Sequence, residues 1–306
     1  MRKLVVVVVP AVVLALAAAA AVSVASPAQV RSANRQAALN AASQLLSAVV
    51  LPPGATEVPA EPAGDGHQLA RSNALALFAA EIDRHEFWTT AASPAAAIAS
   101  VEAHVPAGAK WTGSGYSSGT QFVSYSLPVV DAPVLGARTL SVNAVTLNDG
   151  STGVRADATV RYAAPRLPAQ RVPAQARVLE VAMTAAPFGP APPPTLKTPL
   201  VITRRSEVRR IAALVDGLPF VANLRGIAIS CPAHMPAPIV TFTFRAAMAG
   251  PVLATVSGPA NTPTTAEPCF TTTLTIRGHE QPGLLEGGRL LREAGTILGV
   301  KLTTRG

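Results

Sequence analysis

The clearest pattern in the chain is a strict alternation of apolar and polar side chains between Val154 and Tyr162. An apolar side chain at every second position predicts a strand with one packed face and one face open to water. The turn-like segment at 148–153 should pair this strand with residues 139–147. Similar patterns predict further strands, which are, in chain order, 81–90, 109–114, 121–127, 177–184, 200–203, 240–245, 252–256 and 271–277.

Apolar residues three and four positions apart predict the helices. The first covers 31–51 and should end at Pro52-Pro53-Gly54. We favour docking of this amphipathic helix on its own domain over contact with a membrane surface or a partner. Ser93 and Ser206 are the expected N-caps of two further helices. Two more segments fit weaker helical patterns, namely a short one within 68–80 and a last one near 284–298.

These elements indicate an α+β protein with two small domains, each an antiparallel sheet covered by one or two helices. Residues 185–199 contain six prolines and are predicted to be a linker. The predicted order is a signal or anchor (1–28), an amphipathic helix with a Pro/Gly-rich connection (29–66), a first domain (67–184), the linker (185–199) and a second domain (200–306).

The N-terminus carries a basic start, Arg2-Lys3, followed by an uncharged apolar run from Leu4 to Val24. This pattern is typical of a secretory signal, with cleavage after Ala25 or Ala28. A run of this length, about 31 Å as a helix, would also span a bilayer. Residues 4–24 are therefore either removed or retained as a single-pass anchor. In both cases we expect the body of the protein outside the cytoplasmic membrane, in the cell envelope or the extracellular space.

Two cysteines, Cys231 and Cys269, are the only ones in the chain. In an exported protein an even pair predicts a disulfide, here closing a loop of about 39 residues. A zinc site is not expected, because no cluster of histidines or cysteines with ligand spacing accompanies the pair.

The formal net charge of +8 favours an anionic partner through long-range attraction. An anionic envelope polymer, lipid headgroups or an envelope protein fit an exported chain better than nucleic acid does. The sequence also lacks the interleaved basic and aromatic residues of single-strand binders. The densest basic segment supplies Arg204, Arg205, Arg209 and Arg210 as a candidate contact with an anionic surface, and its alternative is an ordinary solvated helix face.

The segment Gly115-Tyr-Ser-Ser-Gly119 has the spelling of a hydrolase nucleophile elbow around Ser117. An elbow requires a helix after the serine, whereas residues 121–127 alternate as a strand. The order of a catalytic triad would need Asp216 and His279, which fall in the other predicted domain. A glycine-rich turn explains the segment without catalysis.

The tetrad from Asp83 to Glu86 brings two carboxylates close to His85. On a strand Asp83 and His85 face one side and Glu86 the other, and the second histidine of a zinc-protease pattern is missing. We therefore expect no metal there. No phosphate-binding loop or dinucleotide fingerprint occurs, so no cofactor is expected either.

Three short segments resemble secreted or membrane-anchored actinobacterial proteins of unknown function. They cover Ala95 to Gly115, Gly153 to Val160 and Val208 to Pro219, with Cys231-Pro232 adding to the likeness. The resemblance implies export but no activity and no functional residue.

The sequence thus predicts an exported, non-enzymatic envelope protein that binds an anionic component or a partner protein. Two alternatives stay open, a secreted serine hydrolase using Ser117 and a membrane-tethered sensor or regulatory ectodomain.

Overall fold

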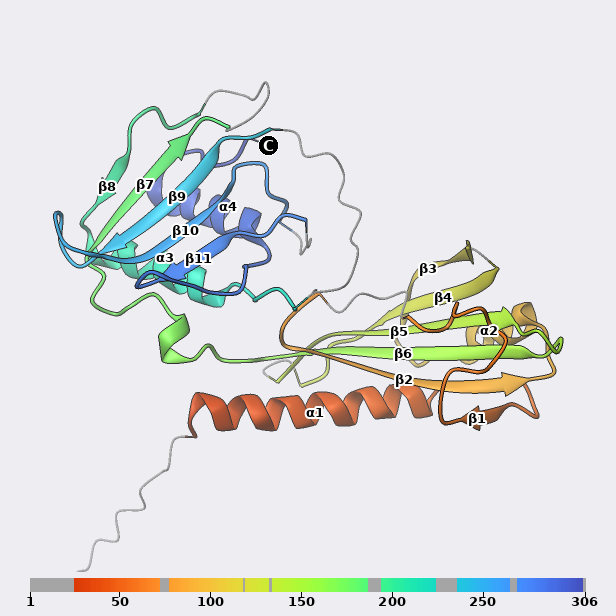
Figure 1. Cartoon of the computed structure of the whole chain (residues 1–306). Coiled ribbons are helices and arrows are strands. Elements are labelled where there is room, and N and C mark those ends of the chain that lie inside the picture. Colours follow the sequence, from red (N-terminus) through yellow and green to blue (C-terminus); the bar gives the residue numbers. More distant parts are fainter. Residues whose placement is uncertain are drawn as a thin grey trace, which may run out of the picture.

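The computed structural model is an α+β protein with two antiparallel sheets of six strands each (Figure 1), as the sequence predicts. The structure describes residues 25–71, 77–117, 119–131, 134–186, 194–223, 236–264 and 269–304. The apolar run at 4–24 lies outside these residues, and no helix within them is long and apolar enough to span a membrane.

The first sheet confirms the predicted pairing of 139–147 with 154–162, with Leu140 opposite Ala158. All of its strand pairs are antiparallel. Its strands, in spatial order, are β1 (Thr56–Val58), β2 (Glu81–Thr90), β6 (Thr152–Tyr162), β5 (Leu135–Thr146), β4 (Thr120–Leu127) and β3 (Lys110–Ser117).

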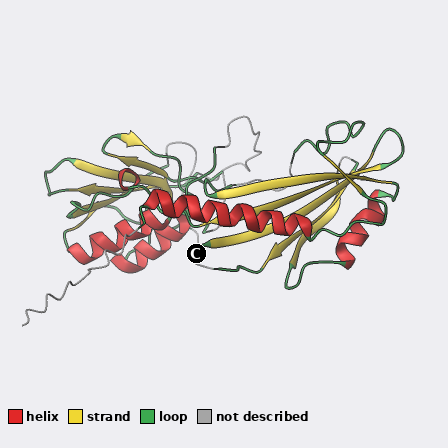
Figure 2. Cartoon of the chain, turned by 90° about the horizontal axis from the view of Figure 1, so that it is seen from below, coloured by secondary structure: helices red, strands yellow, loops and turns green. Residues whose placement is uncertain are grey.

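Two helices, α1 (Pro27–Ser47) and α2 (Pro94–Ala103), cover one face of this sheet (Figure 2). The α1 helix begins four residues earlier than predicted, because Ser26 forms a capping box with Gln29. Its inner face, which includes the fully buried Ala38, packs against the apolar face of the sheet. Docking of this helix on its own domain, the interpretation favoured from the sequence, is therefore confirmed.

The opposite face of β6 was expected to be open to water, and that expectation is wrong. Arg155 and Asp157 are only 4% and 0% exposed. The segment before β2 covers them, because Nη1 of Arg155 donates to the carbonyl of Leu69 at 2.8 Å and Leu69 itself is fully buried. Alternation of polar and apolar residues shows which side chains share a face, but it does not show what covers a polar face.

The connection at 52–66 is more ordered than its composition indicates. It contains β1, and Asp65 accepts hydrogen bonds from the backbone N–H groups of His67 and Leu69. The helix predicted within 68–80 is absent from the described parts of that stretch, which form turns and an isolated bridge. Asp65 provides the physical reason, since a side chain that binds nearby N–H groups stabilises a turn instead of a helix.

The strand predicted at 177–184 belongs to the second sheet, whereas the sequence placed it in the first domain. This strand, β7, pairs with β9, where Leu179 lies opposite Phe244, so it does not belong to the first sheet. The spatial order is β12 (His279–Glu280), β11 (Thr273–Ile276), β10 (Val252–Pro259), β9 (Ile239–Arg245), β7 (Val178–Thr184) and β8 (Leu200–Ile202). Residues 185–199 therefore connect two neighbouring strands of one sheet, and 163–177, with the short 3-10 helix η1 (Pro168–Gln170), connects the two sheets.

Helices α3 (Arg205–Gly217) and α4 (Gly287–Leu298) belong to the second core, which α3 enters through Val208, Ile211 and Val215. Ser206 is not the N-cap of α3. Arg204 occupies that position without a side-chain cap, because the helix starts two residues earlier than an N-cap at Ser206 would place it.

Cys269 lies within the described residues and Cys231 does not, so the disulfide between them stays a prediction. No cysteine of the described part is a free thiol.

Candidate functional site

A pocket of about 760 Å³ lies where the chain passes from the first sheet to the second. Backbone hydrogen bonds fix one side of it, since the N–H of Ala79 donates to the carbonyl of Phe220 at 3.0 Å and that of Ala222 to Leu77 at 2.8 Å. Its lining comes from the first turns of α1, from the segments around Phe78 and Arg166, and from the end of α3. Elements of both sheets thus build one site.

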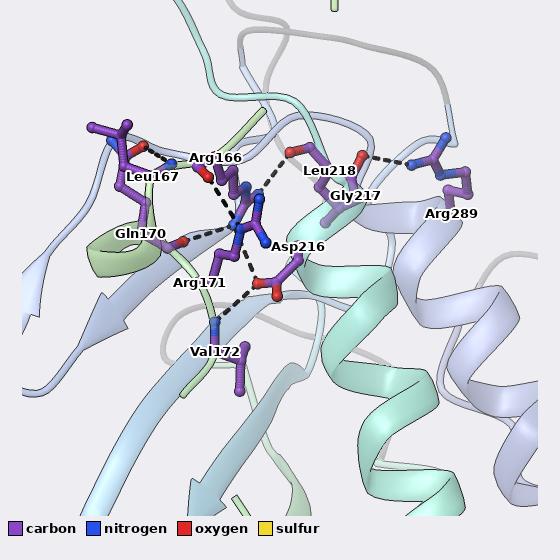
Figure 3. Close-up of polar contacts among 9 residues, drawn as sticks. All are labelled: Arg166, Leu167, Gln170, Arg171, Val172, Asp216, Gly217, Leu218 and Arg289. Carbon is purple, nitrogen blue, oxygen red and sulfur yellow. Dashed lines mark hydrogen bonds and ion pairs between the residues drawn. The ribbon is translucent and has the colours of Figure 1, made fainter. Parts of the chain in front are cut away.

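Arg166 is the most buried charged residue of this pocket, at 6% exposure. Its guanidinium donates to the carbonyl of Leu218 at 2.6 Å and to that of Gln170 at 3.3 Å (Figure 3). The same group stacks over the ring of Phe220, 4.4 Å from its centre. Burial lowers the pKa of Arg166 to about 10, so the side chain keeps its positive charge at neutral pH.

Asp216 supplies the nearest negative charge, with Oδ1 3.9 Å from Nη1 of Arg166. The same oxygen accepts a hydrogen bond from the backbone N–H of Val172 at 2.9 Å (Figure 3). Burial raises the pKa of Asp216, against the lowering effects of that bond and of Arg166 and Arg171. As one carboxylate beside both Arg166 and Arg171, it balances their positive charge only in part.

Three more arginines line the same pocket. Arg31, on α1, donates to the carbonyl of Pro165 at 3.0 Å, and Arg171 donates to that of Arg166 at 3.1 Å. Arg161 stacks over Phe78 at 4.2 Å and has Glu286 at 3.8 Å as its ion-pair partner. Glu286 also pairs with Arg289 at 3.0 Å, so it balances Arg161 only in part. Asp216 is the one carboxylate among the described lining residues.

Two of these arginines also carry unused hydrogen-bond donors. The Nε atoms of Arg31 and Arg166 are buried and have no hydrogen-bond partner among the described residues. An unsatisfied buried donor on a charged group is energetically costly. The pocket is therefore suited to holding an anionic group, whose charge would offset that cost.

The basic cluster predicted from the sequence lies outside this pocket. Arg204, Arg205, Arg209 and Arg210 are all exposed on or beside the first half of α3, whereas Asp216 lies at the end of that helix. Arg204 forms an ion pair with Glu207.

Ser117 is the exposed last residue of β3, and the strand β4 follows it, as predicted. Asp216 lies in the pocket and His279 on the edge strand β12 of the second sheet. The described structure therefore does not assemble these three residues into a triad.

A second polar cluster lies on the face of the first sheet that is opposite α1 and α2 and is covered by the segment before β2. Asp83 and His85 are on that face and Glu86 is on the other, as predicted. Nη2 of Arg155 lies 2.6 Å from the Asp157 carboxylate, and burial together with Asp157 raises the pKa of Asp83 to about 6. Burial lowers the pKa of His85, and Arg155 adds to that effect.

Glu61, Asp65 and His67 form the one group of three metal-ligand types that approach within 4.8 Å of one another in the described structure. Both oxygens of Asp65 already accept backbone N–H groups, so these contacts account for its position without an ion.

Reasoning from the sequence missed the pocket, because its residues come from five separate segments. One signal was present, since Arg161, Arg166 and Arg171 recur every fifth residue in a stretch that also holds Pro165 and Pro168. Such spacing fits neither one face of a helix nor one face of a strand.

Comparison with known proteins adds no information on function, so the functional interpretation rests on the geometry of the pocket. A scan against protein-family models, a search of curated proteins and a search of solved structures each found no match. The resemblance to exported actinobacterial proteins therefore stays a prediction from short segments.

Proposed function

We propose that this protein is exported and binds an anionic component of the cell envelope through the arginine pocket, defined by Arg31, Arg161, Arg166, Arg171 and Asp216. The observation that carries the proposal is the buried guanidinium of Arg166, which has only a long contact with one carboxylate. A buried charge is costly unless it is paired, and an anionic ligand would supply the missing pairing. The N-terminal apolar run supports export of the protein, and its positive net charge supports a negatively charged partner.

The test measures retention of the full chain on an envelope fraction, for the wild type and two matched variants. Arg171→Gln removes an exposed charge from the pocket, and Arg205→Gln removes an exposed charge from the far end of α3. We expect Arg171→Gln to weaken retention roughly tenfold, the loss of one charge-assisted hydrogen bond. Arg205→Gln should retain the wild-type affinity, and raising the salt concentration should weaken binding of all three proteins.

Two results would count against this proposal. The chain is kept in detergent so that residues 4–24 do not insert into membranes of the fraction, and retention that then does not change with salt would exclude an electrostatic partner. An effect of Arg205→Gln as large as that of Arg171→Gln would place the contact on the exposed face of α3, the site expected from the sequence, instead of in the pocket.

A further inference from the structure

The position of the arginine pocket along the chain suggests what kind of anion reaches it. Arg31, which lines the pocket, lies on the second turn of α1. Six residues separate it from Val24, the last residue of the uncharged apolar run, and the helix begins only at Pro27. Seven positions span about 10 Å at the helical rise and about 25 Å at most in an extended chain. With the run retained in a bilayer, the pocket lies near the level of the lipid headgroups.

The lining of the pocket is amphipathic. Its arginines sit beside a larger set of apolar and small side chains, which are Phe78, Ala79, Ala163, Pro165, Pro219 and Phe220. A small inorganic anion would use the charges but leave this apolar surface wet. A molecule with an anionic head and an apolar body would use both parts.

We infer that the arginine pocket binds the phosphate headgroup of an anionic membrane lipid, from the bilayer in which residues 4–24 are anchored. This inference rests on the proposed function and adds to it the ligand class and a retained N-terminus. A phosphodiester carries one negative charge, which offsets half of the surplus of two positive charges that Arg31, Arg166 and Arg171 leave over Asp216. Arginine also suits phosphate geometrically, because its planar fork offers two parallel donors.

The buried Arg166 and the two more exposed arginines have separate roles in this arrangement. Arg171 is exposed and Arg31 is half-buried, so both offer donors at the entrance. Arg166 is held from within by Leu218 and Gln170 and contributes mainly through its electric field. Substituting Arg166 would also break contacts between the two sheets, and the test therefore uses Arg31 and Arg171.

The experiment uses the full chain in lipid nanodiscs and measures its thermal unfolding midpoint. Discs of phosphatidylcholine alone are compared with discs that also contain phosphatidylglycerol. A ligand that binds only the folded state raises this midpoint. We expect a rise of about 2–4 °C or more for the wild type. The double variant Arg31→Gln/Arg171→Gln should lose the rise, and Arg205→Gln should keep it. Each rise is taken relative to the same variant in neutral discs, so a general loss of stability does not affect the comparison.

A further arm adds soluble glycerol 1-phosphate to the neutral discs. If it raises the midpoint as much as phosphatidylglycerol does, the ligand is a soluble phosphate, which overturns the lipid inference and leaves the proposed function intact. A rise with phosphatidylglycerol that persists in the double variant would also overturn the inference. Mass spectrometry of the native protein provides an independent check, because cleavage before Arg31 would contradict a retained anchor. Loss of salt-dependent retention on envelope material would overturn the proposed function as well.

Discussion

At the scale of single residues, the buried pair of Arg155 and Asp157 best shows how the first sheet tolerates charge. Three contacts of 2.6–3.0 Å join the guanidinium to the carboxylate, and a fourth hydrogen bond reaches the carbonyl of Leu69. The ring of Phe87 lies 5.5 Å from the same guanidinium. Burial is possible here because the two charges, two residues apart on one strand face, satisfy each other.

Removing one member of this pair should therefore be costly. We expect Asp157→Ala to lower the free energy of unfolding by about 3–5 kcal/mol, because Arg155 is left charged and buried. The double variant Arg155→Met/Asp157→Leu should lose much less, since neither charge remains. Chemical denaturation measures both, and equal losses in the two variants would show that the pair is not the stabilising feature.

Asp83 makes the stability of the protein depend on pH. Its pKa is about 6 in the folded protein, against an ordinary value of 3.8, so the folded state holds the proton more tightly. Stability should fall as the pH rises from about 4 to 6. Asp83→Asn removes this loss and should stabilise the protein above pH 6 by up to about 1 kcal/mol, a value that allows for screening by water.

The check is the difference in unfolding free energy between Asp83→Asn and the wild type across this pH range. The difference should be largest at pH 7 and should shrink below pH 4, where the wild-type carboxyl is protonated in both states. A constant difference at all pH values would show that the substitution acts through packing instead.

At the scale of elements, the start of α4 depends on Gly288, which allows close contact with the loop after β10. A Cβ added at Gly288 would lie 2.2 Å from the carbonyl oxygen of Thr262 and 2.5 Å from that of Pro263. Gly217, at the end of α3, has no atom within 4 Å of such a Cβ. An alanine is therefore expected to be tolerated at Gly217 and not at Gly288.

We expect Gly288→Ala to destabilise the protein by about 1–3 kcal/mol, because backbone atoms have to move apart. Gly217→Ala should be neutral or stabilising by up to about 1 kcal/mol, since alanine restricts the unfolded chain. Thermal unfolding of the two variants tests the docking of α4, and equal behaviour would contradict it.

The elements also show how far local pattern predicts the fold. The strand at Glu81–Thr90 and the N-cap Ser93 were predicted correctly, because alternation and capping are local properties. The placement of β7 in the first domain was wrong, because Leu179 and Val181 specify a strand and not its neighbour. The arginine pocket was missed for the same reason, since its residues meet only after both sheets have formed.

At the scale of the whole molecule, the predicted disulfide should stabilise the second unit. A crosslink from Cys231 to Cys269 closes about 39 residues and should contribute about 4 kcal/mol by restricting the unfolded chain. We expect a reducing agent to lower the unfolding midpoint by the amount that Cys231→Ser/Cys269→Ser does. A midpoint unchanged by reduction would show that the bridge is absent or contributes nothing.

Backbone hydrogen bonds and a buried charged side chain both connect the two sheets where they meet. Arg166 lies on the connection between the sheets and binds the carbonyl of Leu218 from the second unit, and the backbone of Ala79 binds that of Phe220. Binding of an anion beside Arg166 should therefore tighten the contact between the units as well as neutralise charge.

Hydrogen exchange of the full chain, with and without envelope material, tests the central claim most directly. The account predicts added protection at 165–172 and 216–222, where the arginine pocket joins the two sheets, and this protection should disappear at high salt. Protection confined to 204–210, or none in either region, would contradict the claim that the pocket holds the anionic partner.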